Sequence, residues 1–238
     1  MSFVHLHVHT EFSLLDGANR ISTMMEHVKA IGQDAIAITD HGVMYGVIDF
    51  YRAAKAAGIK PIIGCEVYVA RRTRHDKVHG MDNNPYHLVL LCKNEEGYKN
   101  LIHMVSLSFS EGFYNRPRVD LELLRQHSGG LIALSACLAG AVPSLILQQN
   151  YAAAKEMALE YRDIFGEDNF YLEIQDHGLR EQVDVNRGVL KIAEETGIPL
   201  VVTNDAHYTR REDARIQDVL MCIQTGKTVD DIDRMRFE

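Results

Sequence analysis

Several features that mark special classes of protein are missing from this sequence. Its 238 residues contain no repeat of fixed period and no segment of low complexity. The N-terminus has neither the basic residues nor the apolar run of a signal peptide, so we expect no signal peptide. The longest uncharged run, 129–150, is interrupted by Gly140 and Pro143, and each apolar half is much shorter than the roughly 20 residues of a membrane helix. These absences exclude a repeat protein and argue against a membrane protein.

The sequence contains few cysteines and fewer basic than acidic residues. The four cysteines form no C-x-x-C pair and have no spacing typical of disulfides, which favours a reducing, cytoplasmic location. The 25 Lys and Arg residues are outnumbered by 33 Asp and Glu residues, and the net charge of −8 argues against a protein that coats nucleic acid by bulk electrostatics. A local basic patch or a bound metal cluster is compatible with this balance. The remaining composition, 46% hydrophobic and 24% charged, is typical of a soluble globular protein.

Seven apolar runs, often rich in β-branched residues, have the length of β-strands. Stretches with 3.6-residue periodicity separate most of them, and several of these stretches end at a glycine that can adopt the left-handed conformation, namely Gly32, Gly58 and Gly197. The predicted strands are 3–9, 35–39, 60–70, 86–92, 131–135, 169–175 and 199–204. Alternation of strand and helix predicts an α/β fold built on a parallel sheet or a barrel.

Most of the polar residues that could bind a metal lie at the ends of these predicted strands, where chemistry collects in α/β barrels and open parallel sheets. In "FVHLHVH" the side chains of His5, His7 and His9 share one face, because alternate residues of a strand point the same way. His87 differs, because it precedes its apolar run and would begin the fourth strand. The other candidates are Asp16, Asp40, His41, Glu66, Cys137, Asp176, His177, Asp205 and His207.

Histidine, carboxylate and thiol side chains on a common rim have the ligand chemistry of zinc, manganese or iron. One zinc ion needs three or four protein ligands, so this set is large enough for two or three ions if carboxylates bridge them. Multinuclear sites of this kind hydrolyse phosphate esters. The sequence leaves two possible roles for each of two further histidines. His5 makes either a structural hydrogen bond or a bond to metal, and His177 contacts either a ligand side chain or the substrate.

Basic residues gather in three loops that the predicted topology places on the same rim, at 70–77, 114–120 and 208–213. Any one of these loops alone is best explained as solvated surface. Together they predict an electropositive collar for a phosphodiester backbone. The candidate substrate contacts are Arg71, Arg72, Arg74, Arg116 and Arg118, with His177 beside them.

Five motifs, taken in order, closely resemble the polymerase and histidinol phosphatase (PHP) family. They are "HLHVHTEFSLLDG", "AITDHGVMYG", "IKPIIGCEVYVA", "LSACLAGAV" and "VTNDAHY". The segments "SEGFYNRPRVD" and "TGKTVDDIDRMRFE" resemble the branch of the family found at the N-terminus of the bacterial DNA polymerase III alpha subunit. The resemblance spans residues 1–238 and implies a single domain that folds as a distorted seven-stranded β/α barrel.

The resemblance also implies a metal pocket and an activity. It includes His87 among the ligands despite its place at the start of a strand, and it favours His7 and His9 over His5 as ligands. Since every ligand position holds a residue able to bind metal, it implies two or three divalent ions, most readily zinc, with manganese or iron as alternatives. The implied activity is a metal-dependent 3′–5′ exonuclease that acts on the 3′ end of DNA. The implied ligands are His7, His9, Asp16, His41, Glu66, His87, Cys137, Asp205 and His207.

Two other functions stay open beside the nuclease. One is a structural module that binds metal for stability and docks the remainder of the alpha subunit and a separate proofreading exonuclease subunit. The other is a small-molecule phosphoesterase like histidinol phosphate phosphatase, against which the polymerase-type segments speak. We expect no polymerase activity, because this sequence lacks the palm, thumb and fingers that carry nucleotide transfer in the family.

Overall fold

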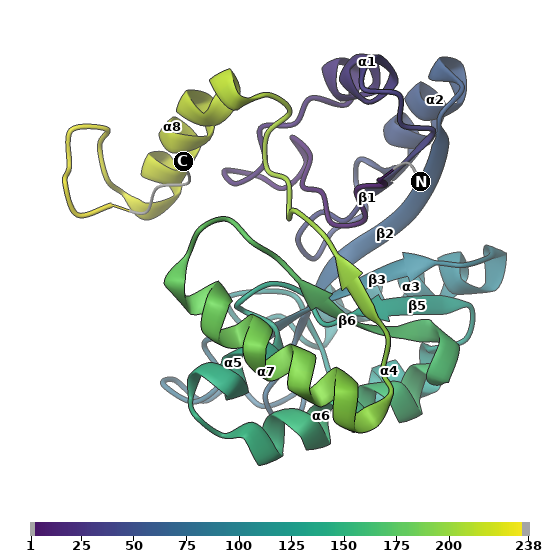
Figure 1. Cartoon of the computed structure of the whole chain (residues 1–238), viewed down its shortest axis with the longest axis vertical. Helices are drawn as coiled ribbons and strands as arrows, with labels where there is room; N and C mark the ends of the chain where they lie inside the picture. The colour runs from purple at the N-terminus through teal and green to yellow at the C-terminus, as the bar shows by residue number, and fades with distance from the viewer. Residues whose placement is uncertain (1–2, 235–238) are drawn as a thin grey trace.

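The structure, a computed structural model, describes residues 3–234 and alternates short strands with helices (Figure 1). The strands are β1 (Ala35–Ile38), β2 (Lys60–Val69), β3 (Tyr86–Cys92), β4 (Arg118–Val119), β5 (Leu131–Leu134), β6 (Phe170–Ile174) and β7 (Leu200–Val202). The α-helices are α1 (Ile21–Ala30), α2 (Val47–Ala57), α3 (Glu95–Ser110), α4 (Leu121–His127), α5 (Ala141–Leu147), α6 (Tyr151–Phe165), α7 (Arg180–Thr196) and α8 (Ala214–Thr225). Short 3₁₀ helices lie at Glu167–Asn169 and Arg211–Asp213. Across the described range 3–234, no helix is long and apolar enough to cross a membrane.

The strands form one curled sheet in the order β1-β2-β3-β5-β6-β7, with β4 paired to β2 off this path. Most neighbours are parallel, but β3 runs antiparallel to both β2 and β5. The sheet is therefore mixed at β3, whereas the sequence predicted a parallel sheet or a barrel. Because of this reversal, the first residues of β3 lie beside the last residues of β2, where Tyr68 pairs with His87.

The predicted strand 3–9 is not a regular strand, and the two-residue strand β4, which the sequence did not predict, makes up the count of seven. The N-terminal segment shares its backbone hydrogen bonds between two neighbours. Val8 O accepts from Thr39 N after β1, and His9 N donates to Ala206 O after β7, both at 2.9 Å. Because the bonds alternate between partners, neither side forms a continuous ladder. The segment nevertheless closes the curled sheet into a distorted barrel.

Side chains of the sheet alternate between an outer core and a narrow interior. On β3, Leu88 and Leu90 belong to the main core, which includes residues of α3 to α7, whereas Val89 packs in a small cluster inside the barrel. By the two-residue period of a strand, His87 faces the interior as well, and so does Glu66 on the neighbouring β2. In Figure 1, α5, α6 and α7 lie on one side of the sheet, and α1 and α2 lie at its other end beside β1.

Helix ends follow the sequence prediction, and the uncharged run is divided between two elements. Gly58 and Gly197 directly follow α2 and α7 with φ of 75° and 73°, and Gly32 ends the turn after α1 with φ of 73°. The run 129–150 forms the strand β5 and the helix α5. The four cysteines are free thiols.

Candidate metal centre

The nine predicted metal ligands lie together at one rim of the barrel. Three groups of their side-chain atoms each lie within 4.8 Å of one another. The groups share His9, His41 and Glu66, so each group is joined to the next. The groups are His7, His9 and Glu66; His41, Glu66 and His87; and His9, Asp16, His41 and His207. Asp205 and Cys137 contact the first and second group, respectively.

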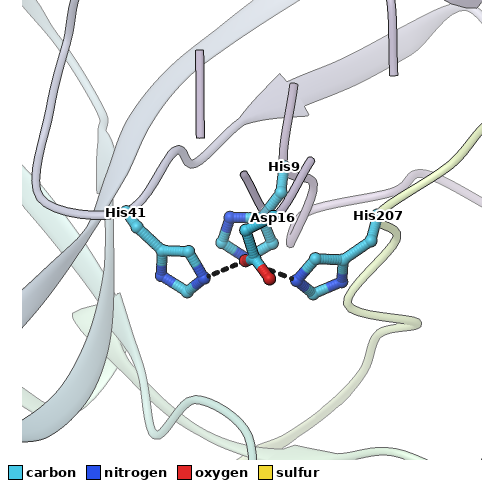
Figure 2. Close-up of side chains that lie close together, drawn as sticks. All are labelled: His9, Asp16, His41 and His207. Carbon is cyan, nitrogen blue, oxygen red and sulfur yellow. Dashed lines mark hydrogen bonds and ion pairs between the residues drawn. The ribbon is translucent and has the colours of Figure 1, made fainter. Parts of the chain in front are cut away.

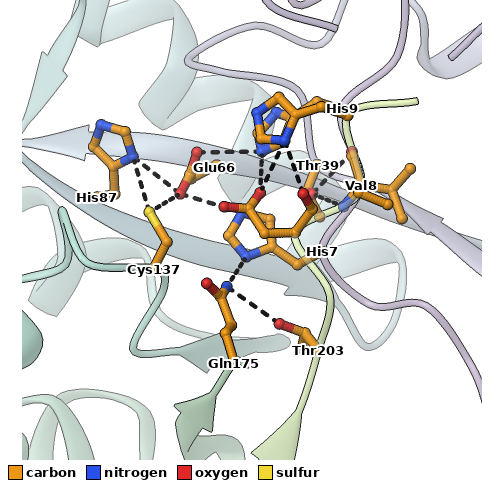
Figure 3. Close-up of polar contacts among 12 residues, drawn as sticks. His7, Val8, His9, Thr39, Glu66, His87, Cys137, Gln175 and Thr203 are labelled. Carbon is orange, nitrogen blue, oxygen red and sulfur yellow. Dashed lines mark hydrogen bonds and ion pairs between the residues drawn. The ribbon is translucent and has the colours of Figure 1, made fainter. Parts of the chain in front are cut away.

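The deepest group is built on the N-terminal segment (Figure 3). His7 Nε2 lies 3.2 Å from both Glu66 Oε1 and Asp205 Oδ1, and His9 Nε2 lies 3.1 Å from the same oxygen of Asp205. Asp205 has a left-handed backbone with φ of 44°, a conformation that aspartate adopts more readily than most residues. Two imidazoles and two carboxylates therefore converge on one point, which is a donor set suited to zinc, manganese or iron.

The second group surrounds Glu66 at the junction of β2 and β3. His41 Nδ1 lies 2.6 Å from Glu66 Oε2, and His87 Nδ1 lies 3.0 Å from Glu66 Oε1. Cys137 Sγ lies 3.9 Å from both Glu66 and His87, just after β5 (Figure 3). His87 reaches this rim from the start of its strand because β3 is antiparallel, which explains its unexpected position in the sequence.

The third group, drawn in Figure 2, is only partly buried, apart from His9. Asp16 Oδ2 lies 2.7 Å from His41 Nε2 and 3.1 Å from His207 Nε2. The ring of His9 stacks on both of these imidazoles, with centroid distances of 4.0 and 4.4 Å. The side chains of His41 and Asp16 are 18% and 13% exposed, whereas those of His7 and His9 are fully buried. The third group is therefore reachable from solvent, as is His87 of the second group, whose side chain is 19% exposed.

Several buried ligand atoms face one another in the pocket without forming hydrogen bonds of regular geometry. Within residues 3–234, His7 Nε2, His9 Nε2, His41 Nδ1, Glu66 Oε2 and Asp205 Oδ1 make no hydrogen bond of acceptable geometry. Buried polar atoms are nearly always hydrogen-bonded, so five such atoms in one place require an explanation. All five are nitrogen or carboxylate oxygen atoms, and each lies 2.6–3.5 Å from another of the five. This donor set fits divalent metal ions.

The pKa values in the pocket reflect a dense charge network. Burial lowers the pKa of His41, but the carboxylates of Glu66 and Asp16 outweigh burial and raise it to about 10. Burial raises the pKa of Glu66, but the facing histidines, His87 first, hold it well below its usual range. His9 behaves differently, because burial and the nearby His41 together lower its pKa to about 3. A metal ion that bound here would replace protons on part of this network.

Glu173 on β6 supports the centre and was missed by the sequence analysis. Its Oε1 lies 2.7 Å from His7 Nδ1 and also accepts hydrogen bonds from Gln175 Nε2, at 2.8 Å, and from the hydroxyl of Thr203. A carboxylate that holds Nδ1–H leaves Nε2 of the same ring available to a metal. The available signal was a glutamate inside the apolar strand 169–175, since a buried charge is rarely found without a partner.

Asp40, placed at a strand end by the sequence, supports a ligand through another side chain. Its Oδ1 accepts from Thr10 N at 2.6 Å and from Ser13 Oγ at 2.8 Å. Ser13 Oγ in turn lies 3.1 Å from His9 Nδ1. Burial raises the pKa of Asp40 despite these donors. The residue therefore fixes the loop after the N-terminal segment and the ring of His9.

His5 and His177 lie outside the ligand groups found in residues 3–234. The ring of His5 packs edge-on against Phe3 at 5.0 Å, and its Nδ1 is buried. His177 is exposed, with Nε2 at 2.8 Å from Asn204 O and Nδ1 at 2.8 Å from Gln182 Nε2. These contacts hold His177 against the loop after β7 and the helix α7.

The five candidate arginines differ sharply in how their donors are used. Arg72 and Arg74 form ion pairs with carboxylates, and Arg71 donates to a backbone carbonyl and a tyrosine hydroxyl. Arg118 is fully buried and donates to three backbone carbonyls at 2.8–3.0 Å. Because these donors are consumed inside the protein, Arg118 cannot contact a substrate, and the expectation for it is corrected. Arg116 is exposed.

Comparison with known proteins identifies relatives of the whole chain. Residues 5–177 match the model of the PHP domain family. The chain is 50% identical over 239 residues to the DNA polymerase III subunit alpha of Treponema pallidum, covering 100% of this chain and 20% of that protein. It is 48% identical over 237 residues to the same subunit of Borreliella burgdorferi, covering 99% of this chain and 21% of that protein. The chain thus spans about a fifth of the length of these curated relatives.

A solved structure gives the same fold. A proposed metal-dependent phosphoesterase from Bifidobacterium adolescentis superimposes with a TM-score of 0.53 at 15% identity, covering 87% of this chain and 88% of that chain. At this level of identity the likeness concerns the fold alone. On the match over residues 5–177, the chain belongs to the PHP domain family.

Proposed function

We propose that the chain is the PHP domain of a bacterial replicative DNA polymerase alpha subunit and that it removes nucleotides from the 3′ end of DNA in the cytoplasm. The observation that carries the proposal is the set of three ligand groups that share His9, His41 and Glu66. Ions bound through shared ligands would lie close together, as hydrolytic sites with two ions require, with spacings of about 3.5–4 Å. We expect two or three divalent ions, with zinc first and manganese or iron as alternatives.

Some residues of the pocket would hold the ions, and others would face the substrate. Glu66 offers both carboxylate oxygens, one toward His7 and His87 and the other toward His41, so it could contribute to holding more than one ion. Divalent ions bound in this pocket would supply a water nucleophile at neutral pH and positive charge next to the leaving oxygen. The part-exposed group around Asp16 would face the reacting phosphate, while the buried imidazoles of His7 and His9 would hold ions from the interior side.

A structural role is the rival that the geometry also favours. The ligands come from the N-terminal segment, from β2, from the start of β3 and from the loop after β7. Ions shared among these segments would hold the barrel closed, as structural metals do. In that case the domain would support the rest of the alpha subunit and dock a separate proofreading exonuclease subunit, without cutting DNA itself.

Hydrolysis of a 3′-labelled single-stranded oligonucleotide, with metal analysis of the same preparation, tests the proposal. Asp205→Asn is the informative variant, because asparagine keeps the size and tolerates the left-handed backbone but removes the charge that faces His7 and His9. We expect a loss of activity of at least about 10–100-fold, with the protein still folded. Arg187→Ala, an exposed position on α7, serves as the control.

Three outcomes decide between the hypotheses. Equal degradation by wild type and Asp205→Asn would assign the activity to a contaminating host nuclease. A metal-loaded wild type that is inactive with zinc, manganese and magnesium, yet more stable than the metal-free protein, would favour the structural role. Hydrolysis of histidinol phosphate but not of the oligonucleotide would favour the small-molecule phosphoesterase.

A further inference from the structure

Arg116 stands apart from the other arginines of the rim. Its side chain is exposed, and within residues 3–234 it takes part in no ion pair and no side-chain hydrogen bond. Its Cζ lies 5.5 Å from the centre of the Tyr68 ring. A guanidinium with unused donors beside a metal pocket is suited to an anionic ligand.

Tyr68 links Arg116 to the metal centre. The ring of Tyr68 stacks on His41, with centroids 5.9 Å apart and planes inclined by 18°. It also meets the ring of His87 edge-on, with centroids 5.1 Å apart. Tyr68 is only 6% exposed, and it is held in register opposite His87 by the β2–β3 pairing. One face of the centre is therefore lined by a fixed aromatic ring, and the guanidinium of Arg116 lies over that ring.

The loop that carries Arg116 is itself well fixed. Tyr114 N donates to Arg116 O at 3.0 Å, and Asn115 between them has a left-handed backbone with φ of 59°. Pro117 follows and is buried against Gly42, where an added Cβ would come within 2.9 Å of the proline ring. These contacts hold the backbone of the loop beside the residue that follows His41, so the guanidinium is kept near the pocket.

We propose that Arg116 is the substrate-binding residue that captures the phosphodiester of single-stranded DNA at the mouth of the metal centre, with Tyr68 as the platform that orients it. This assignment rests on the proposed function and names the contact that brings the backbone to the ions. The planar guanidinium can donate two parallel hydrogen bonds to phosphate oxygens, and its flat face can stay on the tyrosine ring at the same time. A lysine would keep the charge but lose both properties.

Binding and hydrolysis should be measured separately on the zinc-loaded protein. Fluorescence anisotropy with a 5′-labelled single-stranded oligonucleotide, protected at its 3′ end by phosphorothioate linkages, reports binding without turnover. We expect Arg116→Ala to weaken binding about tenfold or more and Arg116→Lys to restore only part of the loss. Arg187→Ala removes the same charge from the exposed face of α7 and should change binding by less than about twofold. Zinc content should be the same in all four proteins.

The outcomes for Arg116 are independent of whether the chain cuts DNA. Selective weakening in Arg116→Ala at equal zinc content supports the assignment, even if the wild type proves inactive on unmodified DNA. Binding by Arg116→Ala that equals wild type overturns it, and so does a wild type that binds no oligonucleotide. An equal loss in Arg187→Ala would also overturn it, because the effect would then be one of net charge. Hydrolysis of unmodified DNA by the wild type tests the proposed function by itself.

Discussion

Replacing Glu173 with glutamine removes one negative charge from behind a metal ligand and keeps the shape of the side chain. The new carbonyl oxygen can take the place of Oε1 and still accept hydrogen bonds from His7, Gln175 and Thr203. What is lost is the charge that holds Nδ1–H of His7 and makes its Nε2 a stronger donor to metal. Removing a contact of this kind typically weakens metal binding about 10–100-fold, which equals about 1.4–2.7 kcal/mol.

The weaker metal binding of Glu173→Gln can be measured both as zinc affinity and as thermal stability. Competition with a chromogenic chelator gives the zinc affinity directly. At a zinc concentration of about 100 times the wild-type Kd, binding stabilises the fold by about 2.7 kcal/mol, and a tenfold weaker site keeps about 1.4 kcal/mol. For a chain of this size the difference lowers Tm by roughly 3–5 °C. This shift should vanish in EDTA, where neither protein holds metal.

The exposed position Glu194 on α7 provides the matched control, because Glu194→Gln makes the same chemical change away from the pocket. It should alter neither zinc affinity nor Tm. An unchanged zinc affinity in Glu173→Gln would refute the role of this carboxylate in orienting His7. A loss of Tm that persists in EDTA would instead assign the effect to packing on β6.

Two further predictions concern the pH dependence of zinc affinity and the stabilising role of the buried Arg118. Zinc affinity should rise with pH between about 6 and 9, by up to about tenfold per pH unit for each proton displaced, because His41, with its pKa raised to about 10, is protonated in the metal-free pocket. Isothermal titration in buffers of different ionisation enthalpy would measure the released protons, and a pH-independent affinity would contradict the expectation. Arg118→Met should lower the free energy of unfolding by at least about 1–3 kcal/mol, because the buried carbonyl of Gly112 loses its donor. The part-buried carbonyls of Arg74 and Asp76 lose theirs as well. Urea denaturation measures this loss, and a variant as stable as wild type would show that water replaces the guanidinium.

Most of the centre could be predicted from sequence because its parts are local. An apolar run followed by a polar residue places His41, Cys137 or Asp205 at a strand end whatever the rest of the chain does. The direction of a strand is a different matter. The apolar run of β3 reads the same in either direction, so only tertiary pairing with β2 and β5 shows that His87 starts its strand on the correct rim.

The contacts that individual side chains make could not be predicted from the sequence either. Arg116 and Arg118 are two residues apart in one basic loop, yet one is exposed and the other is buried among carbonyls. Charge counting treats them alike, because it carries no information about which guanidinium the fold encloses. Glu173 was missed for a related reason, since its partner His7 is 166 positions away in the chain.

The pairing of the N-terminal segment with Ala206 sets an order in time on the assembly of this domain. His7 and His9 leave the ribosome about 200 residues before Asp205 and His207, an interval of roughly 10–40 s at typical bacterial rates. The β2–β3 pair and α3 can pack during that wait, because their contacts are close along the chain. The barrel, by contrast, closes only when the last ligands arrive. Metal loading of the groups that include Asp205 or His207 is therefore a late event in folding, and ions bound there would mark chains that have finished it.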